Sequence, residues 1–221
     1  AGNLKSDSGK NLTFKYNVLN LPQLITSPDG LMKSDYTFGG QKIRKEVTGE
    51  NGSIRDYTGS AEFKDGAPEV YHHEDGRIFF DEDEIHWQYT INDHLGNTVV
   101  VFEDKNEDGI ILTESSTDNP LFLEVLQRNL YYPFGMNLEG GWNQMAEPGM
   151  KYQYNGKELN DELGLDWFDY GARYYDAAIG RFSSIDPLVD APLNIGTSPY
   201  AYVWNNPLIF IDPDGMHGVS H

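Results

Sequence analysis

The chain has 221 residues, 38% of them hydrophobic, which is enough to bury one sizeable core or two small ones. Its 35 acidic and 16 basic side chains give a formal net charge of −19, which argues against nucleic acid and anionic membranes as partners. Cysteine is absent, so disulfides, thiolate metal sites and cysteine nucleophiles are excluded.

The apolar runs of the sequence are short. No stretch approaches the roughly 20 apolar residues that span a bilayer, and the first residues lack the apolar core of a signal peptide. We therefore expect no membrane insertion. Because the chain begins with Ala1 rather than Met, we expect a fragment of a longer polypeptide.

The composition favours short strands joined by tight turns. Gly (23 residues) and Tyr (14 residues) are abundant, and Asn and Asp are frequent, whereas Ala- or Leu-rich helical runs are lacking. The predicted fold class is therefore all-β, with at most one or two short helices.

The first half repeats one unit, in which an aromatic pair at period two is followed by turn residues and a second short apolar strand. Tyr16, Tyr36 and Tyr57 follow one another at intervals of 20 and 21 residues. The strand pairs begin with 14–17 and 24–26, then 35–38 and 43–47, and further units begin at 54–57 and 87–90.

Each unit is predicted to be a β-hairpin, which is too small to bury its apolar face alone. Neighbouring hairpins must therefore stack side by side into a long antiparallel sheet that curls. The alternative is an ordinary β-sandwich whose tyrosines fill alternate strand positions. Further along, residues 119–128 are compatible with a short helix, because Pro120 suits its first turn.

Residues 104–111 match the first half of a calcium-binding loop. Oxygen ligands would come from Asp104, Asn106 and Asp108, Gly109 would make the turn, and Ile110 would take the apolar position. The last ligand position carries Ser115 instead of Glu, so calcium is one interpretation. The other is a hydrated turn in a hairpin between 99–102 and 110–112.

Three histidines and an acidic run invite a metal-site interpretation. His72 and His73 are adjacent, His86 follows, and residues 81–84 are all acidic. Adjacent residues of a strand point to opposite faces, so these histidines rarely share one ion. A hydrated acidic loop is the better interpretation.

The last third carries many short elements in one order. They are Tyr154-Asn-Gly-Lys-Glu158, Asp169-Tyr-Gly-Ala-Arg-Tyr-Tyr-Asp176, Gly180-Arg-Phe182, Asp186-Pro187, Ser198-Pro-Tyr-Ala-Tyr202, Asn205-Asn-Pro207 and Ile211-Asp-Pro-Asp-Gly215. This segment resembles the core domain associated with rearrangement-hotspot (Rhs) and YD-repeat proteins. Residues 92–97 and 131–135 are similar to segments that precede this core in the Bacteroidota branch of the family.

The resemblance implies a curled antiparallel sheet of YD-type hairpins, a partial β-shell, closed by an inward-spiralling core plug. It divides the chain into a YD-repeat-like sheet region (1–149), the Rhs-associated core (150–216) and a tail (217–221). Independently of the family, turn residues every 6 to 12 positions between large aromatics also predict a compact β plug in the last third.

The resemblance further implies self-cleavage after the final Asp-Pro-x-Gly element, between Met216 and His217. The implied catalytic residues are Asp186 and Asp212, assisted by Arg173. Two nearby carboxylates cannot both ionise easily, so one can act as acid while the other activates water. The alternative is that both aspartates are turn residues that accept backbone N–H bonds, with Arg173 as a structural ion-pair partner.

Three functions follow as hypotheses. The first is the cap of a secreted shell, with at most a self-cleaving aspartyl activity and no required cofactor. Its alternatives are a type IX-secreted cell-surface adhesin that docks a protein partner, and the encapsulation module of a polymorphic toxin. An independent hydrolase acting on another substrate has no specific support. The expected partner is another protein or the remainder of its own large polypeptide, and the expected location is secreted or cell surface.

Overall fold

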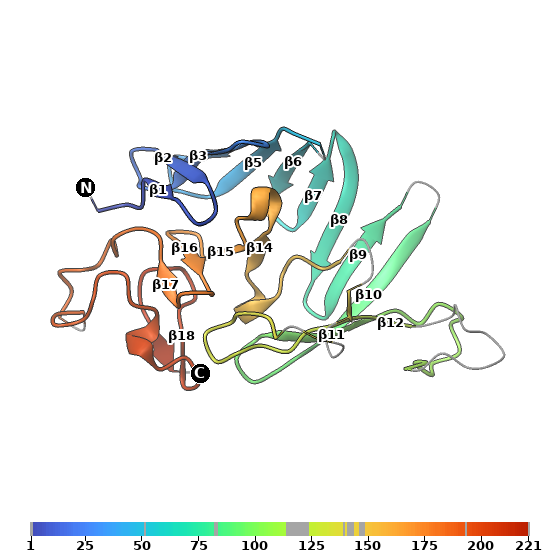
Figure 1. Ribbon diagram of the computed structural model, residues 1–221. Helices are drawn as coiled ribbons and strands as arrows, with labels where there is room; N and C mark the ends of the chain where they lie inside the picture. The colour runs from blue at the N-terminus through green and yellow to red at the C-terminus, as the bar shows by residue number, and fades with distance from the viewer. Residues whose placement is uncertain are drawn as a thin grey trace.

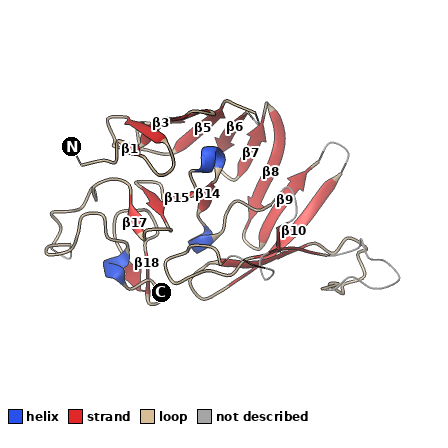
Figure 2. Ribbon diagram, in the orientation of Figure 1, coloured by secondary structure: helices blue, strands red, loops and turns tan. Residues whose placement is uncertain are grey.

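The computed structural model describes residues 2–50, 52–81, 84–113, 124–138, 140, 144–145, 149–192 and 194–220. One thirteen-stranded antiparallel sheet runs in sequence order from β1 to β13, a four-stranded sheet contains β14 to β17, and β18 pairs with β19 (Figure 1, Figure 2). Strict sequence order in one long sheet is the arrangement expected of stacked hairpins, and it replaces the β-sandwich alternative.

The strands of the long sheet are β1 (Ser6–Asp7), β2 (Leu12–Tyr16), β3 (Pro22–Ser27), β4 (Gly30–Tyr36), β5 (Lys42–Val47), β6 (Ser53–Thr58), β7 (Ala61–Lys64), β8 (Ala67–His73), β9 (Gly76–Phe80), β10 (Ile85–Asn92), β11 (Thr98–Phe102), β12 (Val125–Arg128) and β13 (Gln144–Met145). The shorter strands are β14 (Glu158–Asn160), β15 (Trp167–Asp169), β16 (Tyr174–Asp176), β17 (Arg181–Phe182), β18 (Phe210–Ile211) and β19 (Val219–Ser220).

The predicted hairpins of the first half are confirmed. Three hairpins of the long sheet share one type of turn. A main-chain N–H donates to the carbonyl four residues later at Asn17, Thr37 and Asp93. In each case a β-bulge lies just before the turn, and the side-chain oxygen of the first turn residue accepts the amide of the last one. Short polar side chains that bond to nearby amides favour such turns, so the repeat follows from local chemistry.

A predicted helix over 119–128 is wrong where the structure describes it. Residues 119–123 lie outside the described part of the chain, and Val125–Arg128 forms β12, which pairs with β11. Within β12, Val125 and Gln127 are buried while Leu126 and Arg128 are half-buried, the period of a strand. Helical structure in the described residues consists of three 3₁₀ turns, η1 (Tyr154–Gly156), η2 (Glu162–Gly164) and η3 (Val203–Asn205), one more than predicted.

The four-stranded sheet packs against the first strands of the long sheet. Leu12, Phe14, Ile25, Met32 and Val47 bury their side chains with Leu165, Trp167 and Tyr174. The rings of Phe14 and Trp167 stack 4.9 Å apart at an interplanar angle of 5°. This contact joins β2 to β15 and buries large apolar surfaces on both sheets.

The same region also contacts the far end of the long sheet. The Asn155 side chain donates to the carbonyl of Leu95 at 2.9 Å, and its main-chain N–H donates to Oδ1 of Asn97 at 2.8 Å. In Figure 1, β14 lies between the early strands above it and β11 below it. Residues of the last third therefore tie together strands that are distant in the long sheet.

A second core lies within the last third and is mainly aromatic. It contains Tyr154, Phe168, Tyr170, Tyr175, Ala177, Phe182, Tyr202 and Val203. The hydroxyls of Tyr170 and Tyr202 both donate to Oδ1 of Asn155, at 2.7 and 2.6 Å. These bonds satisfy the polar tips of buried tyrosines, as a stable aromatic core requires.

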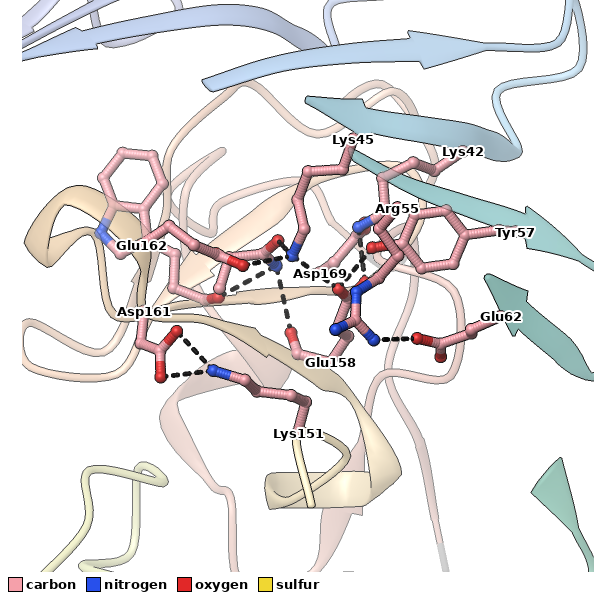
Figure 3. Close-up of polar contacts among 12 residues, drawn as sticks. Lys42, Lys45, Arg55, Tyr57, Glu62, Lys151, Glu158, Asp161, Glu162 and Asp169 are labelled. Atoms are coloured by element: carbon pink, nitrogen blue, oxygen red, sulfur yellow. Dashed lines mark hydrogen bonds and ion pairs between the residues drawn. The ribbon is translucent and has the colours of Figure 1, made fainter. Parts of the chain in front are cut away.

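A buried ionic network crosses the contact between the sheets (Figure 3). Glu158 on β14 accepts from Lys42 at 2.6 Å, from Lys45 at 2.9 Å and from the hydroxyl of Tyr57 at 2.7 Å. Burial acts to raise the pKa of Glu158, but the two lysines and their hydrogen bonds together hold it well below its ordinary value. Glu158 is therefore ionised although it is only 6% exposed, and its charge is held by Lys42, Lys45 and Tyr57.

Candidate self-cleavage site

Arg173 brings the two predicted aspartates together. Its Nη2 lies 3.1 Å from Oδ2 of Asp186 and 3.4 Å from Oδ2 of Asp212. All three residues are buried, and Arg173 is only 2% exposed. One guanidinium nitrogen thus bridges the carboxylates of Asp186 and Asp212, which are 26 residues apart in the sequence.

Arg173 is held from several sides. It ends the turn between β15 and β16, where its carbonyl accepts the N–H of Tyr170 at 3.0 Å. Its Nε donates to the carbonyl of Gly215 at 2.5 Å, and its guanidinium lies 3.7 Å from the ring centre of Phe182. These contacts fix the orientation of the Arg173 guanidinium, so the bridge between Asp186 and Asp212 does not depend on a mobile side chain.

Asp212 follows β18 directly and organises the loop that contains the predicted scissile bond. Its Oδ1 accepts main-chain N–H groups from Gly215 at 2.8 Å, Met216 at 3.1 Å and His217 at 3.3 Å. The nitrogen of His217 is the nitrogen of the Met216–His217 peptide bond. A carboxyl oxygen of Asp212 therefore lies beside the group that would leave during cleavage.

Glycine at position 215 is required by this loop. Its φ is +76°, in the left-handed region, and a Cβ there would lie 3.0 Å from the main-chain nitrogen of Arg173. Both constraints disfavour a side chain at the element that precedes the predicted cut.

Asp186 approaches from another turn. Its Oδ1 accepts the N–H of Leu188 at 2.7 Å, and its own N–H donates to the carbonyl of Pro199 at 3.0 Å. Both aspartates therefore make the turn contacts of the structural interpretation while their Oδ2 atoms face Arg173. The turn contacts use the Oδ1 atoms, and the bridge through Arg173 uses the Oδ2 atoms.

The surroundings of Asp212 raise its pKa. Burial raises the pKa of Asp212 above its ordinary value, and the opposing effects of Arg173 and the Gly215 N–H do not cancel it. Burial also lowers the pKa of Arg173, although both aspartates counteract this. A cavity of about 20 Å³ lies between Arg173, Asp186, Asp212 and His217, and a space of this size holds about one water molecule.

Two residues near the site carried no signal in the sequence. Lys157 donates to the carbonyl of Pro213 at 2.5 Å and lies 5.2 Å from the ring centre of Tyr170. Trp204 lines the same small cavity. Lys157 belongs to the Tyr154–Glu158 element, but no sequence pattern gave it or Trp204 a role at the site, and only the fold brings them to the Asp212 loop.

The predicted calcium loop forms a turn closed by its own side chains. Asp104 accepts from Gly109 at 2.8 Å, Asn106 from Asp108 at 3.0 Å, and Asp108 from Ile110 at 2.8 Å, each on a side-chain oxygen. Residues 110–113 form no strand, so the alternative hairpin is wrong. Ser115 lies outside the described residues, and calcium binding stays a prediction.

The histidines bind different carboxylates. His72 lies 2.7 Å from Glu62, and His86 lies 2.7 Å from Glu103. Residues 82 and 83 of the acidic run lie outside the described part of the chain. Within that part, no three His, Cys, Asp or Glu side chains gather where they could hold a metal ion, and no helix is long and apolar enough to cross a membrane.

Comparison with known proteins gives partial matches in sequence. No family model matches the chain. It is 40% identical over 93 residues to toxin subunit YenC2 of Yersinia entomophaga and 41% identical over 69 residues to the tRNA nuclease WapA of Bacillus subtilis. These matches cover 42% and 29% of this chain, but only 9% and 3% of the two relatives.

A third relative is the salivary gland surface protein 1 of Aedes aegypti, 37% identical over 90 residues, or 41% of this chain and 2% of that protein. The chain thus spans less than a tenth of the length of these relatives. The Bacteroidota assignment and the type IX adhesin hypothesis find no support among the matches.

Solved structures share the fold. A Photorhabdus luminescens Tc holotoxin pore matches with a TM-score of 0.73 and 20% identity, over 97% of this chain and 10% of that one. A crystal structure of TcdB2-TccC3 matches with a TM-score of 0.70 and 19% identity, over 93% and 10%. The long antiparallel sheet is therefore the fold of a segment of these toxin chains, and this chain is similar to the Rhs/YD-repeat shell region of Tc toxin subunits and WapA proteins.

Proposed function

We propose that this chain is a shell segment of a large Rhs/YD-repeat polypeptide that encloses a cargo segment, and that it cuts its own chain between Met216 and His217. In this proposal the long sheet is part of the curled wall, and residues 150–216 form the inward plug that closes it. The polypeptide would be secreted or placed at the cell surface. The toxin names of several relatives and the shared fold support encapsulation over adhesion.

The observation that carries the cleavage proposal is the 3.3 Å contact from the His217 nitrogen to Oδ1 of Asp212. Burial raises the pKa of Asp212 above its ordinary value, which is the direction that a general acid requires. Asp186, on the other side of Arg173, would be the general base. Arg173 would orient Asp186 through the contact at 3.1 Å.

The reaction would proceed by hydrolysis. Asp186 takes a proton from water while the water oxygen attacks the carbonyl carbon of Met216. Asp212 gives its proton to the nitrogen of His217 as the carbon–nitrogen bond breaks. The products are a carboxyl group on Met216 and an amine on His217, and proton exchange with solvent resets the two aspartates.

The test is the intact mass of the purified chain during incubation. Wild type should lose residues 217–221, and Asp186→Asn or Asp212→Asn should stay whole. Asp176→Asn is a matched control, because Asp176 is also buried and also accepts the amide two residues later, at 2.9 Å, but does not touch Arg173. The rate should fall as the pH rises above the pKa of Asp212, because the acid is then lost.

Wild type that stays whole at every pH would refute self-cleavage and leave the aspartates as turn residues. Encapsulation needs its own test in the longer polypeptide. There, the segment that follows Met216 should resist an added protease until heat opens the sheet, and rapid digestion of the folded protein would refute the enclosing role.

A further inference from the structure

The predicted scissile bond lies in the loop of a small hairpin. Strand β18 leads directly into Asp212, and β19 follows the bond after Gly218. The two strands pair antiparallel, with Phe210 opposite Ser220 and Ile211 opposite Val219. The chain is therefore held on both sides of the bond, by the Asp212 loop before it and by β19 after it.

Gly218, the second residue after the bond, lies directly against Trp204. A Cβ at this position would lie 2.6, 3.0 and 3.2 Å from three ring carbons of Trp204. Distances this short are not tolerated between carbon atoms, so any larger residue at 218 must displace the indole or itself.

A second contact restrains the indole of Trp204. It edges onto the ring of Phe210, with centroids 5.2 Å apart at 83°, and Phe210 belongs to β18. The indole is thus placed between the strand that leads to Asp212 and the segment that follows the cut.

The backbone that carries Trp204 is strained. Val203, Trp204 and Asn205 have φ values of +38°, +53° and +59°. The left-handed region is sterically unfavourable for residues that carry a Cβ. Strain of this kind persists where the surrounding structure imposes it, often at functional sites. Here it fixes the indole beside the cavity that Arg173, Asp186 and Asp212 line, and Gly218 lines the same cavity.

We propose that Trp204 is the specificity-determining residue for the segment after the cut. It accepts glycine alone at position 218 and, together with β18, holds residues 217–220 so that the Met216–His217 bond stays at Asp212. This inference rests on the proposed self-cleavage and names which sequence the site can cut.

The experiment is a double-mutant cycle on the cleavage rate of the full chain. Gly218→Ala should slow cleavage at least tenfold, because the added methyl meets the indole. In a Trp204→Ala background the same substitution should slow cleavage less than twofold, because the obstacle is gone. Ser220→Ala, two residues further along the chain and exposed, is the control and should cut at the wild-type rate.

Cleavage of Gly218→Ala at the wild-type rate would overturn the proposal. An equal slowing by Gly218→Ala in both backgrounds would also overturn it, because the effect would then not pass through the indole.

A second readout works whether or not the bond is cut. In intact chains carrying Asp186→Asn, amide hydrogen exchange over residues 217–220 should rise at least tenfold on adding Gly218→Ala, and less than twofold when Trp204→Ala is already present. Unchanged exchange would refute the packing of Gly218 against Trp204. If wild type is never cut but exchange follows this pattern, self-cleavage is refuted, whereas the role of Trp204 in holding residues 217–220 is supported.

Discussion

Replacing Glu158 with glutamine should test the ionic network between the two sheets. The side chain keeps its shape but loses the charge that Lys42 and Lys45 face at 2.6 and 2.9 Å. Breaking one partner of a buried ion pair costs about 3–5 kcal/mol. Each lysine keeps a second carboxylate, Asp169 at 2.8 Å and Glu162 at 2.7 Å, so we expect the lower end, about 3 kcal/mol.

This loss should be visible in thermal unfolding. For a chain of this size, 1 kcal/mol shifts the midpoint by about 2–4 °C, so Glu158→Gln should lower Tm by about 6–12 °C. Asp161→Asn is the control. The Lys151–Asp161 pair has similar distances, 2.6 Å, but its side chains are 35% and 41% exposed, and an exposed pair contributes about 0–1 kcal/mol. Equal Tm shifts for the two variants would refute the role given to burial.

The network also predicts a pH dependence. The pKa of Glu158 in the folded protein is well below its ordinary value of 4.5, so its ionisation stabilises the folded state in full above about pH 4.5. That contribution declines as the pH falls below 4.5 toward the folded pKa. The difference in unfolding free energy between wild type and Glu158→Gln should therefore shrink below pH 4.5, and a constant difference from pH 7 to pH 3 would contradict the depressed pKa.

Three further outcomes follow from the contacts described. Trp167→Ala removes the ring stacked on Phe14 and should cost about 3–5 kcal/mol in denaturant unfolding, and a cost under 1 kcal/mol would contradict this packing. Gly215→Ala should cost about 1–3 kcal/mol for its positive φ and should abolish the loss of residues 217–221 by mass, because the loop that presents the bond must move. Calcium at a hundredfold excess over its Kd would add about 2.7 kcal/mol if the loop at 104–110 binds it, and an unchanged Tm with and without chelator would remove that prediction.

The hairpins could be predicted because their signals are local. Tyr16 and Tyr36 stand before Asn17 and Thr37, whose short polar side chains close the turns within five residues. The helix over 119–128 was predicted from a similarly local pattern and is wrong at Val125–Arg128. There the neighbouring strand β11 supplies hydrogen-bond partners that no helical propensity can reveal.

The candidate site could be predicted only in part. Arg173, Asp186 and Asp212 were named from the family resemblance, and the structure brings them together. No sequence signal indicated Trp204 against Gly218, because glycine near the end of a chain is ordinary and the clash exists only in three dimensions. The ion pairs of Glu158 join residues 113 and 116 positions apart and have no local signature either.

The ionic network and the candidate cleavage site are physically connected through Asp169. Its Oδ2 binds Lys42 of β5 at 2.8 Å, while its Oδ1 accepts the N–H of Gly171 at 2.8 Å in the turn that leads to Arg173. One carboxylate therefore both fastens β15 to Lys42 of the long sheet (Figure 3) and shapes the turn that leads to Arg173. Since the site is assembled from turns rather than from rigid strands, the position of Arg173 relies on this attachment. The long sheet therefore helps to hold the turn that carries Arg173, the residue that bridges Asp186 and Asp212.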